Sequence, residues 1–417
     1  MSSSSKTSFS TFTSYAATPK SATTPETSNI RVVVRIRPKT DYEISRENSP
    51  STPNSRVSQL HAPHEDEPVA ISPLGDGKSL QLLDISRKGS DEGTKRVLTF
   101  HRVYEETTDQ ERVFEECGVK DLVSQAINGY AATIFAFGQT GSGKTFTITG
   151  PEHHWSLHPE RLGIIPRALE HLFSETTANH PADTFIIRAT YLEIYNELVQ
   201  DLLSPLASPT SSLPVRWTAE RGFYVENAIT VECRDLDDCI AVLEEGLKNR
   251  STGAHRLNEY SSRSHSIMTV YIESGEGESM KRGKISFVDL AGSERVRESR
   301  AKGDTLTETM SINKSLLTLG NCISALADPK KRNGHIPYRD SNLTKLLSDS
   351  LGGSGLALMI ACISPSSVNL QESLKHCDMQ PEPEKSATDL LFKLDQSVIK
   401  FSLFVGKSMV SAEKTLP

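Results

Sequence analysis

Long apolar runs are missing from this sequence. Nowhere in its 417 residues does an uninterrupted apolar stretch approach the roughly 18 residues that span a bilayer. The first 29 residues contain nine Ser and seven Thr, and no apolar segment of the length that a signal peptide needs. We therefore expect a cytosolic or nuclear protein without membrane contact. Residues 1–29 should form a disordered arm, because so few apolar side chains cannot offset the entropy of ordering.

Paired cysteines are also missing. No two of the six stand in a C-x-x-C arrangement, which argues against a zinc site and against a disulfide framework. We predict buried, free thiols in a reducing compartment. The six residues are Cys117, Cys233, Cys239, Cys322, Cys362 and Cys377.

What the sequence does contain is an alternation of strand and helix patterns. Apolar, β-branched runs predict strands over 30–36, 131–137, 184–195, 266–274, 283–292 and 356–364. Apolar residues spaced by three and four predict helices between them, as over 312–326. The alternation predicts an α/β domain whose central sheet carries helices on both faces. Ligands of such sheets bind beyond the carboxyl ends of the strands.

A glycine-rich loop follows the predicted strand 131–137. Residues 138–145, GQTGSGKT, fit the pattern G-x-x-x-x-G-K-[ST]. In this pattern backbone N–H groups surround the phosphates, the lysine (Lys144) reaches the β- and γ-phosphates, and the last hydroxyl (Thr145) ligates Mg²⁺. A glycine-rich turn without a ligand is the alternative, and the buried strand directly before the loop argues against it. The loop predicts a site for a nucleoside triphosphate.

Two further polar segments border buried strands. In DLAGSE (289–294), Asp289 can hold Mg²⁺ through water and the Gly292 N–H can meet a γ-phosphate. In NEYSSRSH (258–265), the serines can ligate the metal and hold the attacking water, and Arg263 can pair with a carboxylate. Each segment is weak evidence alone, since a Ser-rich run is more often a polar turn. Their order after the glycine-rich loop favours the nucleotide interpretation.

Taken together, the segments RIRP (35–38), GQTGSGKT, NEYSSRSH and DLAGSE resemble the four nucleotide motifs of the kinesin motor domain, in the same order. The resemblance covers about residues 30–376. It implies a P-loop NTPase-type fold with a central mixed β-sheet flanked by helices, ATP and Mg²⁺ as cofactors, and microtubules (tubulin) as the partner. The implied activity is a microtubule-stimulated ATPase of the cytoskeleton that couples γ-phosphate sensing to filament affinity.

The resemblance also assigns site residues. The nucleotide pocket would comprise Arg35, Pro38, Gly138, Gln139, Thr140, Gly141, Ser142, Gly143, Lys144, Thr145 and Phe146. The Mg²⁺ ligands would be Thr145, Ser262 and, through water, Asp289. Catalytic roles would belong to Lys144, Asn258, Ser261, Arg263, Gly292 and Glu294. Arg263 and Glu294 would form an ion pair that closes the site and relays a proton from the lytic water. This suits phosphoryl transfer, which asks a protein mainly for positioning and charge stabilisation.

A basic segment stands out in this acidic chain. Residues 281–345 contain thirteen Lys or Arg against seven Asp or Glu, a local charge of +6 in a chain of net charge −7. The resemblance places this charge against acidic tubulin. The residues concerned are Arg295, Arg297, Arg300, Lys302, Lys314, Lys330, Lys331, Arg332, Arg339 and Lys345. Nucleic acid is the rival partner, but no aromatic residues that could stack on bases alternate with these charges.

Two regions depart from the family pattern. Residues 39–95 are long and rich in Ser and Pro, so we expect a surface insertion. After residue 376 the pattern is lost: Pro381 and Pro383 prevent a helix, and neither a neck linker nor a heptad stalk follows. Spaced apolar residues between 390 and 405 could replace a helix, bind a partner or have no selected role, of which we favour the last.

The atypical tail over 377–417 leaves two function classes open. In the first, the chain is a monomeric, ATP-hydrolysing motor domain. In the second, it is a non-motile or catalytically impaired microtubule-binding isoform with a regulatory role. A GTPase is a third class, but no N-K-x-D guanine signature ends a strand.

Overall fold

The computed structural model describes residues 30–47, 71–84, 94–151, 158–179, 184–204, 212–219, 221–256, 260–275, 279–293, 304–327, 331, 333–352 and 355–365. The expected arm (1–29) and the atypical tail (377–417) lie outside these residues and stay predictions. None of the described helices is both long and apolar enough to cross a membrane. Five of the six cysteines are described, and all five are buried free thiols, as predicted.

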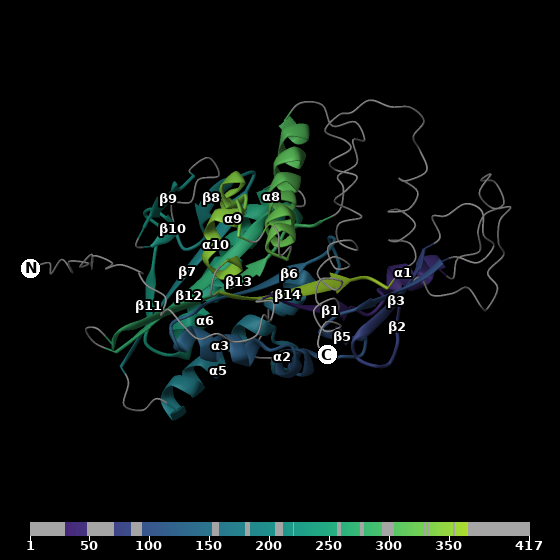
Figure 1. The fold of residues 1–417 in the computed structure, drawn as a ribbon, viewed down its shortest axis with the longest axis horizontal. Coiled ribbons are helices and arrows are strands. Elements are labelled where there is room, and N and C mark those ends of the chain that lie inside the picture. Colours follow the sequence, from purple (N-terminus) through teal and green to yellow (C-terminus); the bar gives the residue numbers. More distant parts are fainter. Residues whose placement is uncertain are drawn as a thin grey trace, which may run out of the picture.

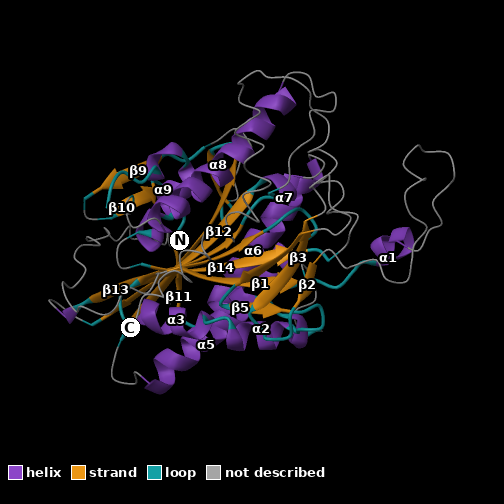
Figure 2. Cartoon of the chain, turned by 45° about the vertical axis from the view of Figure 1, so that its right-hand side comes forward, coloured by secondary structure: helices purple, strands orange, loops and turns teal. Residues whose placement is uncertain are grey.

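A mixed β-sheet forms the centre of the molecule (Figures 1 and 2). Among the described residues it has nine strands. Eight follow one another in the order β11 (Val231–Cys233), β7 (Phe185–Tyr195), β12 (His265–Ser274), β13 (Lys281–Asp289), β6 (Ala131–Phe137), β14 (Leu356–Ile363), β1 (Ile30–Ile36) and β5 (Arg102–Tyr104). The ninth, β8 (Leu198–Asp201), pairs with β7. The strands from β13 to β5 pair in parallel, whereas β12, β7, β11 and β8 pair antiparallel.

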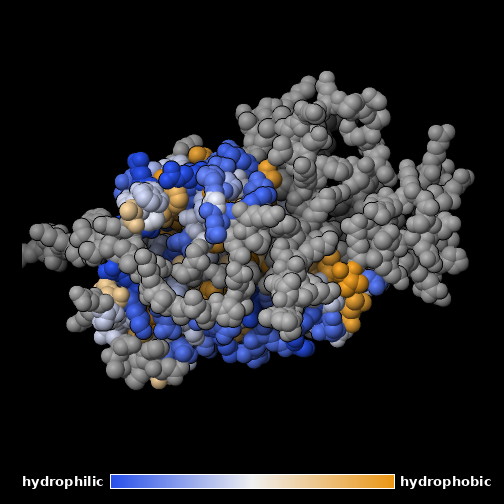
Figure 3. Space-filling model, viewed as in Figure 1, coloured by the Kyte–Doolittle hydropathy of each residue, from blue (hydrophilic) through white to orange (hydrophobic). Residues whose placement is uncertain are grey.

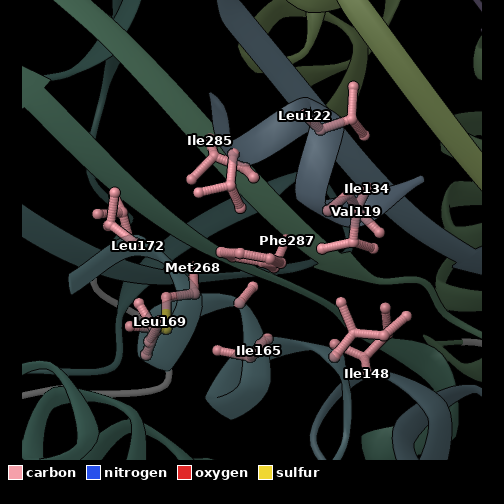
Figure 4. Packing of buried hydrophobic residues seen from close by; sticks show 14 of the residues in the cluster. Val119, Leu122, Ile134, Ile148, Ile165, Leu169, Leu172, Met268, Ile285 and Phe287 are labelled. Atoms are coloured by element: carbon pink, nitrogen blue, oxygen red, sulfur yellow. The ribbon is translucent and has the colours of Figure 1, made fainter. Parts of the chain in front are cut away.

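Each face of the sheet carries its own hydrophobic core, because successive side chains of a strand point to opposite faces. In β1, for example, Val33 belongs to one cluster and Val32 and Val34 belong to the other. The first core includes side chains of α2 (Gln110–Glu116), α3 (Val119–Ile127), α5 (Ile164–Asn179) and α6 (Leu236–Arg256). Figure 4 shows part of it around Phe287.

The opposite core includes side chains of α8 (Asp304–Ala327), α9 (Asn342–Leu346) and α10 (Ser348–Leu351). In Figure 1 these three helices lie above the sheet, and α2, α3 and α5 lie below it. Helices therefore cover both faces, as the alternation of patterns predicted.

The expected surface insertion over 39–95 is described only in part, because 48–70 and 85–93 lie outside the described residues. This stretch contains α1 (Asp41–Glu47), β2 (Ile71–Pro73) and β3 (Ser79–Asp84), and β3 pairs with both β2 and β4 (Thr94–Thr99) in a small antiparallel sheet. Ile71 and Leu80 are buried in the second core, so this part is built into the fold. Leu74 and Val97 are exposed, and Figure 3 shows a hydrophobic patch at this end of the molecule.

One buried tyrosine offers a test of the packing. Tyr104 in β5 is 2% exposed, and its hydroxyl has no hydrogen-bond partner in the part of the chain that the structure describes. Burial raises the pKa of Tyr104 well above its usual value. Because an unsatisfied buried hydroxyl is destabilising, Tyr104→Phe should raise the free energy of unfolding by about 1 kcal/mol. Urea denaturation followed by circular dichroism measures this change.

Tyr191 provides the matched control. It is equally buried in β7, but its hydroxyl shares a hydrogen bond with Ser266. Tyr191→Phe should therefore lower the free energy of unfolding by about 1 kcal/mol. Equal destabilisation by the two substitutions would contradict the prediction for Tyr104.

Candidate functional site

The glycine-rich loop leaves the sheet at the end of β6. Gly138, Gly141 and Gly143 have φ values of 152°, 75° and 95°, which residues with a side chain rarely adopt. A Cβ on Gly138 would also lie 2.2 Å from the carbonyl oxygen of Cys362 in β14. The positive φ values of the loop and the close approach of Gly138 to the Cys362 carbonyl therefore both require glycine. A loop of this kind presents successive backbone N–H groups to an anion.

Lys144 begins α4 (Lys144–Ile148) directly after the loop. Its ammonium group donates to the carbonyl oxygens of Gly138 and Gln139, each at 2.9 Å, and the residue is 8% exposed. The hydroxyl of Ser142 is buried and has no hydrogen-bond partner among the described residues. A buried cation beside an unsatisfied hydroxyl fits an anionic ligand such as a triphosphate.

The predicted magnesium ligands come together at the end of β13. The Thr145 hydroxyl donates to Oδ2 of Asp289 at 2.8 Å. Oδ1 of Asp289 is buried without a hydrogen-bond partner among the described residues. The carbonyl of Ser262, at 2.7 Å, accepts the Gly292 N–H, so the three loops meet. Hydroxyl and carboxylate oxygens are hard ligands that suit Mg²⁺, and the unsatisfied carboxylate oxygen fits a metal-bound water.

The loop after β13 also touches the glycine-rich loop. The backbone N–H of Ser293 donates to the Gly138 carbonyl at 3.1 Å. The N–H of Gly292, predicted to meet the γ-phosphate, donates to Ser262 in this structure. A phosphate that takes over this N–H must therefore break a contact between two loops. The hydrogen bond between Gly292 and Ser262 would then differ between the phosphate-bound and phosphate-free states.

A buried arginine that was not predicted from the sequence holds Asp289 in place. Nη1 of Arg250 donates to Asp289 Oδ2 at 2.8 Å and to Ser266 Oγ at 3.0 Å. Nη2 donates to the Ser264 carbonyl at 3.3 Å, and Nε lies 3.6 Å from Oε1 of Glu193. Burial disfavours the guanidinium charge, but Asp289 and Glu193 outweigh burial and raise the pKa of Arg250. The charge on Asp289, a predicted metal ligand, is thereby compensated inside the protein.

The sequence did contain a signal for Arg250. In α6 the buried residues Cys239 and Leu243 are four apart, and Gly246 and Arg250 continue the same helical face. Gly246 lies so close to the sheet that a Cβ there would be 1.9 Å from the ring of Tyr191. An arginine on such a face has to find a buried anion.

The two arginines of the RIRP segment have different surroundings. Arg35 points into the core, where Nη1 donates to Gln110 Oε1 at 2.5 Å and to Thr147 Oγ1 at 2.9 Å. Its guanidinium carbon lies 5.5 Å from the centre of the Phe146 ring. Arg37, which was not predicted, donates through Nε to the Gly141 carbonyl at 2.6 Å. Arg37 therefore contacts the phosphate loop directly, whereas Arg35 supports Phe146.

Arg37 is itself held by a carboxylate. It forms an ion pair with Glu43 of α1, with Nη2 2.6 Å from Oε1. Glu43 also accepts hydrogen bonds from Thr40 and from Ser364, the residue after β14. The bond from Arg37, together with the others, holds the pKa of Glu43 well below its usual range despite burial. Pro38 is exposed beside this network, and Phe146 is half-buried.

Several predicted catalytic residues are not described. Asn258 and Glu294 lie outside the described residues, and of Ser261 only the backbone is described, in α7 (Tyr260–Arg263). Arg263 ends this helix and is half-buried. The ion pair between Arg263 and Glu294 therefore stays a prediction.

Four of the ten predicted microtubule-binding residues are described, and they lie on one side of the sheet. Lys314 of α8, Arg339 of η3 (Tyr338–Asp340) and Lys331, which lies in a turn before η3, are exposed. Lys345 of α9 donates to Asn342 Oδ1 at 2.9 Å. The helices α8, α9 and η3 pack against one another, and Figure 3 shows mostly hydrophilic side chains in this upper region. The other six predicted positions lie outside the described residues: Arg295, Arg297, Arg300, Lys302, Lys330 and Arg332.

Comparison with known proteins gives a consistent result. The sequence model of the kinesin motor domain matches residues 35–379. The chain is 42% identical over 368 residues to the kinesin-like protein KIF12 of Mus musculus, a match that covers 85% of this chain and 51% of that protein. It is 42% identical over 294 residues to the kinesin-like protein KIF27 of Homo sapiens, with 68% of this chain and 21% of that protein covered. The chain thus spans about half the length of KIF12 and less of KIF27.

A solved structure of a fast kinesin has the same fold. It superposes with a TM-score of 0.70 at 32% sequence identity, covering 90% of this chain and 91% of that one. Its published description concerns the ATPase mechanism and interactions with microtubules of that protein.

Proposed function

This chain belongs to the kinesin motor domain family, and from that premise we propose that it hydrolyses ATP with Mg²⁺, faster on microtubules, and couples γ-phosphate contact to filament affinity. Kinesin motor domains are generally ATPases that bind microtubules. The observation that carries the proposal for this chain is the meeting of three loops, in which Thr145 bonds to Asp289 and Ser262 bonds to Gly292.

We assign separate roles in phosphate binding, metal binding and hydrolysis to the residues of the site. The glycine loop and Lys144 bind the phosphates, and Thr145, Ser262 and Asp289 would hold the metal. Bound Mg²⁺ supplies positive charge that neutralises and orients the phosphates. Arg250 holds Asp289 in position through a hydrogen bond. Asn258 and Ser261 position the water, and Glu294 with Arg263 closes the site and accepts a proton through a second water.

Hydrolysis on the filament tests this function. Steady-state ATP turnover of the full chain, measured with and without microtubules, should rise by about tenfold or more on the filament, the scale of a typical coupling between two sites. Binding to microtubules without turnover would favour the alternative of a catalytically impaired regulatory isoform. A chain that binds neither ATP nor microtubules would refute both.

A second prediction concerns the exposed basic residues on the side of the sheet that carries α8 and α9. Replacing Lys314, Lys331 and Arg339 together by Ala should weaken co-sedimentation with microtubules and flatten its dependence on salt. Exposed charges are screened beyond roughly 8 to 10 Å at physiological salt, so their contribution to docking should depend on salt. Turnover without microtubules should stay within about twofold, since none of the three residues is assigned to the nucleotide site.

A matched control removes three charges from the opposite side. Lys248 of α6 and Arg234, just before α6, are exposed, and Lys120 of α3 is half-buried. Both α3 and α6 pack on the other face of the sheet. Joint replacement of the three residues by Ala changes net charge equally and should leave microtubule binding unchanged. Equal weakening by both triple variants would mean that only net charge matters, and would exclude a specific face.

A further inference from the structure

One histidine connects the loop after β13 with the long helix α8. His265 is the first residue of β12 and is 2% exposed. Its Nδ1 lies 2.9 Å from the backbone nitrogen of Ala291, next to Gly292. Its Nε2 lies 2.7 Å from the hydroxyl oxygen of Ser315 in α8. A single imidazole thus bonds to the loop that meets the phosphate loop and to the helix that carries Lys314.

The hydrogen bonds fix the protonation of the ring. A backbone N–H can only donate, so Nδ1 must accept from Ala291 and carries no proton. The proton of the neutral ring is therefore on Nε2 and is donated to Ser315. Burial, reinforced by the charge of Arg250, lowers the pKa of His265 to about 3, which agrees with a neutral ring.

Several described residues of α8 make contacts of a different kind. Leu316, Leu319 and Ile323 are buried in the second core. Apolar contact is non-directional, so a helix can slide over it at small cost. A hydrogen bond weakens steeply when its distance or angle changes. The bond from His265 to Ser315 therefore favours one position of α8 relative to Ala291.

We propose that His265 is a positioning residue that couples the loop around Gly292 to the position of α8, and hence phosphate contact to filament affinity. The inference rests on the proposed function. When Gly292 exchanges Ser262 for a phosphate, the neighbouring Ala291 moves with it. The ring follows Ala291 through Nδ1 and draws on Ser315 through Nε2. A purely structural histidine would make the same two bonds, but its loss would leave the difference between the nucleotide states unchanged.

Two substitutions break the link at its α8 end. Ser315→Ala removes the acceptor on the helix. His265→Asn keeps an acceptor for the Ala291 N–H, but its amide is too short to reach Ser315. In both variants the ratio of microtubule dissociation constants in ADP and in a non-hydrolysable ATP analogue should fall about fivefold or more, the scale of a typical coupling between sites. Affinity for the analogue without microtubules should change less than about twofold.

Thr318→Val is the matched control, because it removes a buried hydroxyl one turn further along the same helix. It should keep the wild-type ratio. Hydrogen exchange of residues 304–327 supplies a readout without filaments: the difference between the two nucleotide states should be present in wild type and lost in Ser315→Ala.

The outcomes separate the inference from the function. If wild type shows nucleotide-dependent filament affinity and both variants retain it, the inference is wrong and the function stands. Loss of the ratio in Thr318→Val as well would show that any change in α8 has this effect, which also overturns the inference. A wild-type chain without nucleotide-dependent affinity or exchange would overturn the proposed function, and the inference with it.

Discussion

Arg250→Met is expected to lower the free energy of unfolding by about 3 to 5 kcal/mol, because it removes the cation from two buried carboxylates. Asp289 and Glu193 are both at most 2% exposed, so water cannot replace the guanidinium. Domains are stable by only about 5 to 15 kcal/mol, so the variant should be close to unfolded at 37 °C. Urea denaturation at 25 °C measures the loss.

Two companion variants make the test specific. Arg234 forms an ion pair with Asp238 at the surface, where solvent screens it, so Arg234→Met should leave the denaturation midpoint unchanged. Arg250→Lys keeps the charge but loses the forked geometry, and should fall between wild type and Arg250→Met. If Arg250→Met were as stable as wild type, the buried network would have no structural importance.

Lys144→Ala is expected to weaken ATP binding by about 100-fold, since truncating one member of a buried charged contact costs several kcal/mol. The ammonium is already held inside the loop by the Gly138 and Gln139 carbonyls, and no other cationic side chain is predicted for the β- and γ-phosphates. Titration with a fluorescent ATP analogue measures the dissociation constant. The melting temperature of the variant shows whether the fold is intact.

Glu294→Ala is the control that separates binding from chemistry. It leaves the phosphate loop untouched, so ATP and microtubule binding should persist. Turnover should fall by about 100-fold or more, the contribution of a positioned acid or base. Unchanged turnover would reject the role assigned to Glu294, and tight ATP binding by Lys144→Ala would reject the role assigned to the loop.

The parts of the fold that were predictable are those with a strong local signal. The runs of β-branched residues in β1, β6 and β14 matched their strands because these strands are buried on both faces. The prediction for β13 was too long, since the strand ends at Asp289 rather than at residue 292. Leu290 and Ala291 are as apolar as the strand, but the following backbone groups bond to Ser262 and Gly138 instead of a neighbouring strand.

The parts that were not predictable depend on contacts between distant segments. The motifs located Thr145 and Asp289, whose chemistry follows from residue type and spacing. Arg250 and His265 act through partners 39 and 50 residues away, and no local pattern indicates which partner a buried polar residue will meet. The short strands β2, β9 (Val215–Thr218) and β10 (Gly222–Val225) have too few residues for a clear alternation.

The order of strands in the sheet has a consequence for how the protein is made. Ile30 at the start of β1 pairs with Ala357 in β14, so among the described strands the first to be synthesised pairs with the last. At about 5 to 20 residues per second, a ribosome needs roughly 15 to 65 seconds to travel from one to the other. During that interval one edge of an apolar, β-branched strand has no neighbour and can pair with other nascent chains. The amount of folded protein in a cell should therefore depend on chaperones that shield this edge of β1 until β14 emerges.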